Sequence, residues 1–195
     1  MTKSPHTRIH LLSLAFLVGA LTLVAAGCGT EDNGPPPDYA KLTSDSKPPL
    51  KELYEQGNEL IDGGQDAFDA QLEKVHGYPT VVNIWASWCG PCRAEFPHLQ
   101  DAAAAMGEKV AFLGVNTFDS SDAARTFLDD NPLPYPSFSD GDRAINDDLV
   151  DGRLLPATAF FDAEGNKTYT KLGPYTSTED LEADVKKYAI NGIEG

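Results

Sequence analysis

The chain has 195 residues, 41% of which are hydrophobic, and its formal net charge is −15. This length favours one domain with an added tail or targeting segment, and the apolar content is sufficient for an ordinary core. A surface this acidic repels phosphate backbones, so we expect no nucleic-acid partner.

The first 27 residues have the layout of a secretory signal. Lys3 and Arg8 form a basic start, residues 11–26 carry no charge, and Val-Ala-Ala-Gly precedes Cys28. That ending resembles the lipobox of bacterial lipoproteins, which implies that Cys28 is lipidated after cleavage. The uncharged stretch is also just long enough for an uncleaved signal anchor that crosses the bilayer at a tilt. Both interpretations place the domain outside the cytoplasm, tethered to the bacterial cell membrane.

The segment after the signal divides into a linker and an extension. Residues 28–49 are polar and proline-rich, which predicts an extended, lipid-anchored linker without helix. Apolar residues then recur at helical spacing over 50–61 and 68–75, with a glycine pair between the two groups. We therefore expect a short helical extension over 50–76, followed by the main domain at 77–195.

The main domain alternates apolar runs typical of buried strands with amphipathic helical patterns. This alternation predicts an α/β fold with a mixed central sheet flanked by helices. In chain order we expect a strand at 80–86, a helix at 91–106, a strand at 110–115, a helix from Ser120 or Ser121 to Leu128, at most one short strand in 131–139, a short helix at 142–149, a hairpin of 158–161 with 167–172, and a last helix capped by Ser177.

The three cysteines divide into one remote residue, Cys28, and one pair, Cys89 and Cys92. The pair forms Cys-Gly-Pro-Cys at the predicted junction of a strand and a helix, and Pro91 suits a first helical turn. Cys89 then lies at the helix N-terminus, where unpaired amides and the helix dipole favour a thiolate. Because the thiolate is the attacking species in disulfide exchange, we expect Cys89 to attack and Cys92 to close the disulfide.

A zinc site is the competing interpretation of two closely spaced cysteines. A structural zinc ion needs four ligands, and the sequence has no second Cys-x-x-Cys and no paired histidines. His98 is the one nearby residue of a suitable type, and we expect it to face solvent from the helix. We therefore expect a redox pair with neither a metal nor a cofactor.

The stretch from Val81 to Pro97, VVNIWASWCGPCRAEFP, resembles the TlpA/ResA-like thioredoxins, which are bacterial extracytoplasmic thiol–disulfide reductases. The resemblance runs from about Gly77 to the C-terminus and implies a thioredoxin-like fold. Leu155-Pro156-Ala157-Thr158 is similar to the cis-proline loop of that family. The sequence departs from the family in residues 151–155, where a glycine-rich approach to the proline is usual, and in the 50–76 extension, which replaces an N-terminal hairpin.

The resemblance also assigns roles to further residues. It implies that Pro156 is cis and packs beside the disulfide, and that Leu155 offers its backbone to a substrate strand. It makes Trp88 a rim residue over the disulfide and Glu95 a carboxylate that handles protons near the thiols. From the residues alone, Pro156 is equally an ordinary loop proline, and Glu95 is a surface carboxylate that stabilises the helix start.

Two further residues near the pair have simpler expectations. Trp85 is expected to pack in the core. Asn83 stands where cytoplasmic thioredoxins carry a buried aspartate, so Glu95 is the one carboxylate nearby in sequence that can serve that purpose.

The family implies a reductase that acts on protein substrates with disulfides or thiols, is recharged by a membrane electron donor, and has the haem-attachment cysteines of c-type cytochromes as its best-known targets. A net disulfide-forming oxidase is the alternative, although the Gly-Pro dipeptide between the cysteines favours a reducing potential. A non-enzymatic copper chaperone would use the same thiols, but Met1 and Met106 are the only methionines available for such a site.

Overall fold

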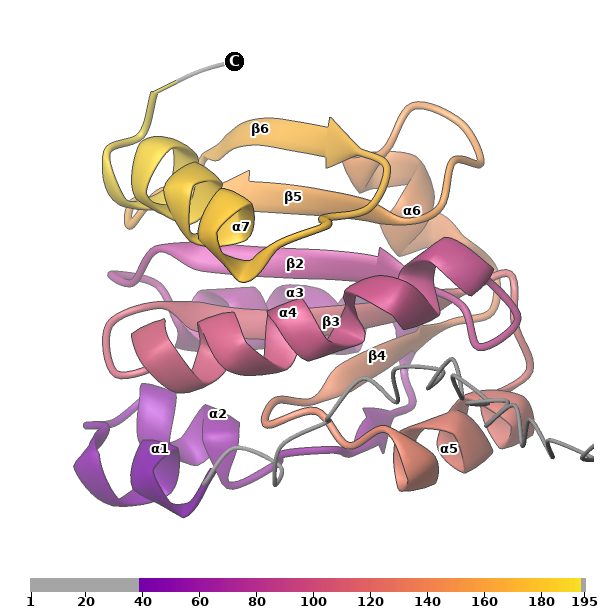
Figure 1. Ribbon diagram of the computed structural model, residues 1–195, viewed down its shortest axis with the longest axis horizontal. Helices are drawn as coiled ribbons and strands as arrows, with labels where there is room; N and C mark the ends of the chain where they lie inside the picture. Colours follow the sequence, from indigo (N-terminus) through magenta and orange to yellow (C-terminus); the bar gives the residue numbers. More distant parts are fainter. Residues whose placement is uncertain (1–38, 194–195) are drawn as a thin grey trace, which may run out of the picture. The chain divides into compact units, whose positions relative to one another are not determined.

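A mixed sheet organises residues 39–193, which are the residues that the computed structural model describes (Figure 1). Within them the sheet has six strands in the order β1-β4-β3-β2-β5-β6. The pairs from β1 to β2 are parallel, and β5 pairs antiparallel with both β2 and β6. This arrangement confirms the predicted α/β class with a mixed sheet. The strands are β1 (Leu60–Ile61), β2 (Thr80–Trp85), β3 (Ala111–Thr117), β4 (Ser137–Asp140), β5 (Ala157–Phe161) and β6 (Lys167–Leu172).

Helices cover both faces of the sheet (Figure 1). On one face lie α4 (Gly90–Met106) and α7 (Thr178–Asp184), and α7 continues into a π-helical turn, η1 (Val185–Ile190). On the other face lie α3 (Gly64–Lys74) and α6 (Ala144–Leu149). Because both faces are covered, β2 and β3 are buried along their whole length, which explains their nearly continuous apolar sequences.

Helix starts follow the capping residues that the sequence contains. Ser120 caps α5 (Ser121–Asp130) by accepting a hydrogen bond from the Ala123 amide at 3.2 Å. Ser177 caps α7 in the same way through the Asp180 amide, also at 3.2 Å. These contacts satisfy amides that have no partner inside the helix, which is why serine at these positions predicted the helix starts correctly.

The segment before the main domain differs from its prediction in two places. Residues 40–45 form a helix, α1 (Ala40–Asp45), inside the expected linker, because the prolines of that segment lie before and after this stretch. The expected helix at 50–61 ends early, as α2 (Leu50–Tyr54). The chain turns through residues 55–58, where Asn58 has a left-handed backbone with φ of 63°, and residues 60–61 then pair with β4 as β1. The 50–76 extension therefore contributes a strand to the sheet.

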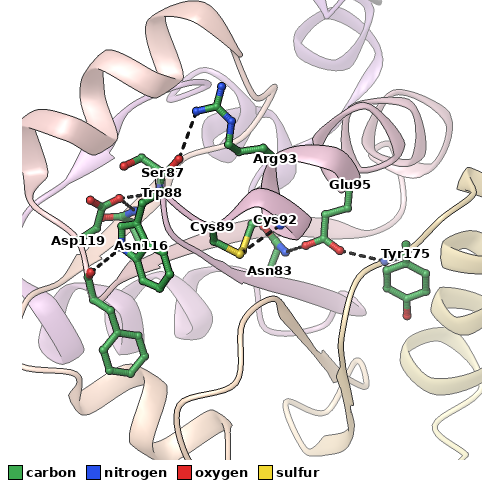
Figure 2. Close-up of a disulfide and its surroundings, with 11 residues drawn as sticks. Asn83, Ser87, Trp88, Cys89, Cys92, Arg93, Glu95, Asn116, Asp119 and Tyr175 are labelled. Atoms are coloured by element: carbon green, nitrogen blue, oxygen red, sulfur yellow. Dashed lines mark hydrogen bonds between the residues drawn. A yellow bond between two sulfur atoms is a disulfide. The ribbon is translucent and has the colours of Figure 1, made fainter. Parts of the chain in front are cut away.

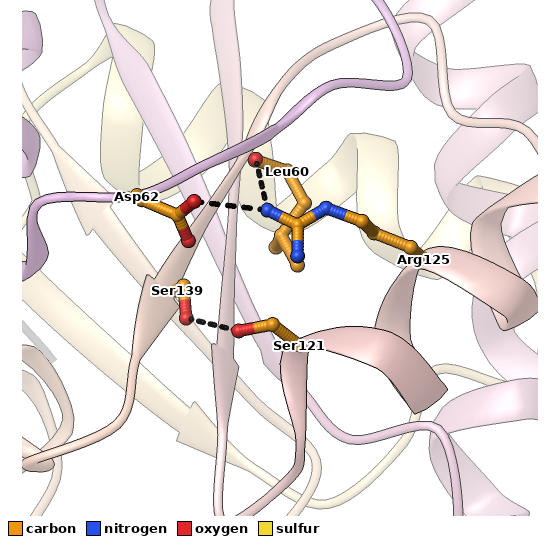
Figure 3. A network of polar contacts seen from close by, with 5 residues as sticks. All are labelled: Leu60, Asp62, Ser121, Arg125 and Ser139. Carbon is orange, nitrogen blue, oxygen red and sulfur yellow. Dashed lines mark hydrogen bonds and ion pairs between the residues drawn. The ribbon is translucent and has the colours of Figure 1, made fainter.

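Polar contacts between α5 and the sheet edge hold β1 in this position (Figure 3). The Arg125 guanidinium donates to the Asp62 carboxylate at 3.0 Å and reaches the Leu60 carbonyl at 3.5 Å. The Ser121 and Ser139 hydroxyls lie 3.2 Å apart, which joins the start of α5 to β4. The ion pair is exposed, so it contributes little to stability, but it shows how the edge strand is attached.

Aromatic side chains fill the core between α4, α5 and the sheet. Trp85 is fully buried, as predicted, and its ring lies 5.2 Å from Phe96 of α4 and 5.6 Å from Phe127 of α5, centroid to centroid. Its indole N–H donates to the Ser137 hydroxyl at 3.3 Å. Gly114 of β3 lies beneath this contact, where a Cβ would collide with Ser137 and crowd the indole. The glycine therefore makes room for the tryptophan that ends β2.

The predicted signal at 1–27, Cys28 and the first part of the linker lie outside the described residues. Among residues 39–193, the helices are too short and too polar to span a bilayer.

Candidate active site at the start of helix α4

The Cys89–Cys92 pair lies where β2 passes into α4, as the sequence predicts. Cys89 is the N-cap residue of α4, with an extended backbone, and its sulfur accepts a hydrogen bond from the Cys92 amide at 3.2 Å. Pro91 occupies the first turn, where its missing N–H leaves no hydrogen bond unmade. The two sulfurs are joined in a disulfide. The helix dipole and free amides at this end stabilise negative charge on the Cys89 sulfur once the disulfide is reduced.

The two cysteines differ in access to solvent. Cys92 is fully buried, and Cys89 keeps 4% of its surface exposed. An incoming sulfur therefore meets Cys89 first, because Cys92 lies one turn inside α4 behind it. This geometry agrees with attack by Cys89 and resolution by Cys92.

Glu95, three residues after Cys92, is fully buried in α4, on the Cys92 side of the disulfide (Figure 2). One carboxylate oxygen accepts from the Asn83 side-chain amide at 2.9 Å, and the other accepts from the Tyr175 backbone amide at 3.0 Å. Burial raises the pKa of Glu95 from 4.5 to about 7, and the two hydrogen bonds and the charge of Lys171 offset only part of that increase. The surface-carboxylate interpretation is therefore wrong.

The turn before Cys89 is held by a residue that sequence reasoning missed. The Asp119 carboxylate accepts from the Ser87 amide at 2.6 Å and from the Asn116 side chain at 3.1 Å (Figure 2). Asp119 comes shortly after the end of β3, which runs parallel to β2, so the two strands end at the same edge of the sheet. That shared edge was the available signal, since polar residues after neighbouring parallel strands meet there.

The predicted rim residues lie in two places, the loop before β5 and the turn before α4. The Leu155–Pro156 peptide is cis, as the resemblance implied. Pro156 is buried and Leu155 is half-buried, and Ala157 pairs with Ile84 of β2, so this loop lies beside the strand that leads to Cys89. Trp88 is 64% exposed, and its indole N–H donates to the Phe118 carbonyl at 2.8 Å.

His98 is half-buried, whereas we expected it to face solvent. Its Nδ1 atom lies 3.2 Å from the Thr178 hydroxyl, because α7 packs against α4 at this point. Within residues 39–193, no three or more histidine, cysteine, aspartate or glutamate side chains are grouped so that they could hold a metal ion.

Comparison with known proteins identifies the family. A family model described as Redoxin matches residues 44–187, which include both the cysteine pair and the whole of the 50–76 extension. A thioredoxin of Rhodospirillum rubrum is 36% identical over 116 residues, or 60% of this chain and 88% of that protein. The thiol–disulfide oxidoreductase ResA of Oceanobacillus iheyensis is 32% identical over 101 residues, or 51% of this chain and 52% of the relative. The chain thus spans about half the length of that relative.

A solved structure supports the same placement. A secreted disulfide oxidoreductase of Mycobacterium tuberculosis, described as homologous to DsbE of Escherichia coli, is 28% identical with a TM-score of 0.52. The superposition covers 58% of this chain and 84% of that one. With a cysteine pair at the start of α4, a cis proline beside β2 and a family model that covers both, the chain belongs to the Redoxin family as a TlpA/ResA-like thioredoxin-family protein.

Proposed function

We propose that this protein is a thiol–disulfide oxidoreductase that works outside the cytoplasm and reduces disulfides in exported proteins. The observation that carries the proposal is the Cys89–Cys92 pair, with one sulfur at the open end of α4 and the other buried behind it. Relatives named as thiol–disulfide oxidoreductases and thiol:disulfide interchange proteins support the reaction class. A structural relative described as secreted supports the compartment.

In the proposed reaction, the Cys89 thiolate attacks one sulfur of the client disulfide. A Cys89–client disulfide forms as the client bond breaks, and the departing client thiolate takes up a proton. The Cys92 thiolate then attacks the Cys89 sulfur, which forms the Cys89–Cys92 disulfide and releases the second client thiolate. Two electrons pass from the protein to the client, and a membrane dithiol donor returns them to the protein.

Glu95 is suited to manage the proton of Cys92. Cys92 must lose its proton before it attacks, and it lies in a buried setting that water does not reach. A carboxylate with a pKa of about 7 one turn away can accept that proton and later return it at physiological pH. Asn83 and the Tyr175 amide hold the carboxylate in place for this purpose.

The direction of net electron flow is tested by the reduction potential of the Cys89/Cys92 couple. We expect a value near that of thioredoxin, about −270 mV, because the couple shares the Gly-Pro dipeptide with thioredoxin. The potential is measured by equilibrating the protein with glutathione or dithiothreitol buffers and quantifying the free thiols. A value close to about −120 mV, as in strong oxidases, would contradict a reductase and favour a net disulfide-forming oxidase.

We propose that Cys28 carries a lipid that anchors the domain to the membrane, with residues 1–27 removed as the signal. In a bacterial host, Cys28→Ser should abolish incorporation of labelled fatty acid into the protein. The matched control is the double variant Cys89→Ser and Cys92→Ser, which should keep the label. Mass spectrometry of membrane-bound material that showed an intact, unlipidated Met1 terminus would contradict the lipid anchor and support the signal anchor.

We also propose a class of client proteins. The resemblance to TlpA/ResA-like proteins supports the haem-attachment cysteines of exported c-type cytochromes as one client class. Such a client must present an accessible disulfide, since the reacting sulfur of Cys89 is itself barely exposed.

A further inference from the structure

Phe118, which directly follows β3, has a left-handed backbone with φ of 56°. This conformation is rare and costly for a bulky side chain, and such residues persist where surrounding contacts hold them. Here the Phe118 carbonyl accepts the indole N–H of Trp88, and the next residue, Asp119, binds the Ser87 amide. The Phe118 backbone is therefore fixed by the turn that carries Cys89.

The Phe118 ring is in contact with a cationic side chain, Arg153. The Arg153 guanidinium lies over this ring at 5.5 Å from its centroid, a cation–π contact. Arg153 is exposed, and within residues 39–193 its guanidinium forms no ion pair or hydrogen bond. The neighbouring Leu154 is 56% exposed. Both residues belong to the 151–155 segment, where this sequence departs from the glycine-rich pattern that its resemblance predicts.

Arg153 differs from the neighbouring charged groups in having no hydrogen-bonding partner among residues 39–193. The chain carries 30 acidic and 15 basic residues, so an unpaired guanidinium at the rim stands out against a negative background. Asp119 is occupied by amide donors from Ser87, Asn116 and Ser120. Arg93, which follows Cys92, stacks on Phe127 and also donates to the Ser87 carbonyl at 3.4 Å. Arg153 thus keeps its hydrogen-bonding capacity available for a partner.

We propose that Trp88, Phe118, Arg153 and Leu154 form a client-docking edge that selects an extended segment with an acidic residue next to its reacting cysteine. The inference rests on the proposed function and adds a substrate class to it. Trp88, directly before Cys89, and Leu154, two residues before Pro156, offer exposed apolar surface, and Arg153 offers a planar donor that matches a carboxylate. Phe118 contacts Trp88 through its carbonyl and Arg153 through its ring, so it links the turn before Cys89 to the 151–155 segment.

The test uses two synthetic peptides, each with one internal disulfide, that differ only in Asp or Lys beside the first cysteine. The reduced full-length protein is assayed at 0.15 M salt for kcat/KM on each peptide, and the ratio cancels general effects on exchange. Relative to the native protein, the Asp-to-Lys ratio should fall about threefold in Arg153→Gln, the scale of an exposed ion pair. It should fall further in Arg153→Glu, because the reversed charge repels the acidic peptide and attracts the basic one.

The matched control is Lys109→Gln, which removes the same charge. Lys109 is exposed and precedes β3, whereas Cys89 follows β2, so the two lie at opposite ends of these parallel strands. An unchanged ratio in both Arg153 variants, or an equal fall in Lys109→Gln, would overturn the docking edge while the exchange itself stands. If the native protein exchanged with neither peptide, the proposed function and this inference would both fail.

Discussion

Replacing Cys92 with serine should let the protein attack one client disulfide and then stop. Cys89 remains at the N-terminus of α4, so the first attack proceeds, but no second sulfur is present to release the client. The full-length Cys92→Ser protein should therefore accumulate one covalently bound client per molecule, while catalytic turnover falls to the background rate. Cys89→Ser should show neither trapping nor turnover, because the fully buried Cys92 does not reach a client. Non-reducing gels and a turnover assay measure both outcomes.

Cys28→Ser is the control for the roles assigned to Cys89 and Cys92. Cys28→Ser should retain full turnover in detergent solution, since Cys28 is remote in sequence from the pair. Alkylation of the reduced native protein should label Cys89 before Cys92, because Cys89, unlike Cys92, has exposed surface. Faster labelling of Cys92 would contradict the roles given to the two sulfurs.

Replacing Glu95 with glutamine should change the pH behaviour of the thiols. Above a pH of about 7, Glu95 is ionised, and its negative charge opposes a thiolate on either sulfur of the nearby Cys89–Cys92 pair. Glu95→Gln should therefore lower the pKa of the Cys89 thiol by about one unit, and it should slow release of the client, since Cys92 loses its proton acceptor. Titration of thiolate absorbance in both proteins measures the first effect, and rapid mixing measures the second.

The stability of the oxidised protein supplies an independent readout, because Cys89 and Cys92 do not titrate while they form a disulfide. Burial raises the pKa of Glu95 from 4.5 to about 7, so between these values the folded state binds more protons than the unfolded state. Stability from this group is thus fully present below pH 4.5 and is lost as pH rises to about 7. Over this range the free energy of unfolding should fall by about 3 kcal/mol. In Glu95→Gln this fall should be absent, because glutamine does not titrate.

Glu164→Gln is the matched control for both measurements, since Glu164 is exposed between β5 and β6. It should leave the thiol titration and the pH dependence of unfolding unchanged. Thiolate titrations of Glu95→Gln that superimpose on those of the native protein would exclude the proton-handling role. Chemical denaturation at pH 5 and pH 8 checks the stability effect.

The elements of the main domain could be predicted because their signals are local. The capping serines Ser120 and Ser177 satisfy amides within three residues, and the buried strands β2 and β3 show as continuous apolar runs. The Cys-Gly-Pro-Cys motif likewise carries its own context, a strand before it and a helix after it. For these features, the interactions that decide the structure are made mostly by residues close together in the sequence.

Features that depend on distant contacts could not be predicted in this way. Leu60 and Ile61 fit a helical spacing, and only their pairing with β4 makes them a strand. Glu95 resembled a surface carboxylate, because charged residues are rarely fully buried and its partner Tyr175 contributes only a backbone amide. A backbone amide leaves no side-chain pattern in the sequence, so this contact across 80 residues could not be predicted.

We expect the Cys89 sulfur, and not that of Cys92 or Cys28, to form the bond to the client. The most direct test is to react the Cys92→Ser protein with a disulfide-containing peptide, digest the product without reductant, and map the cross-link by mass spectrometry. We expect a single linked peptide that joins the client sulfur to Cys89. A cross-link at Cys28, or an unmodified Cys89 in protein that has consumed the peptide disulfide, would contradict the account.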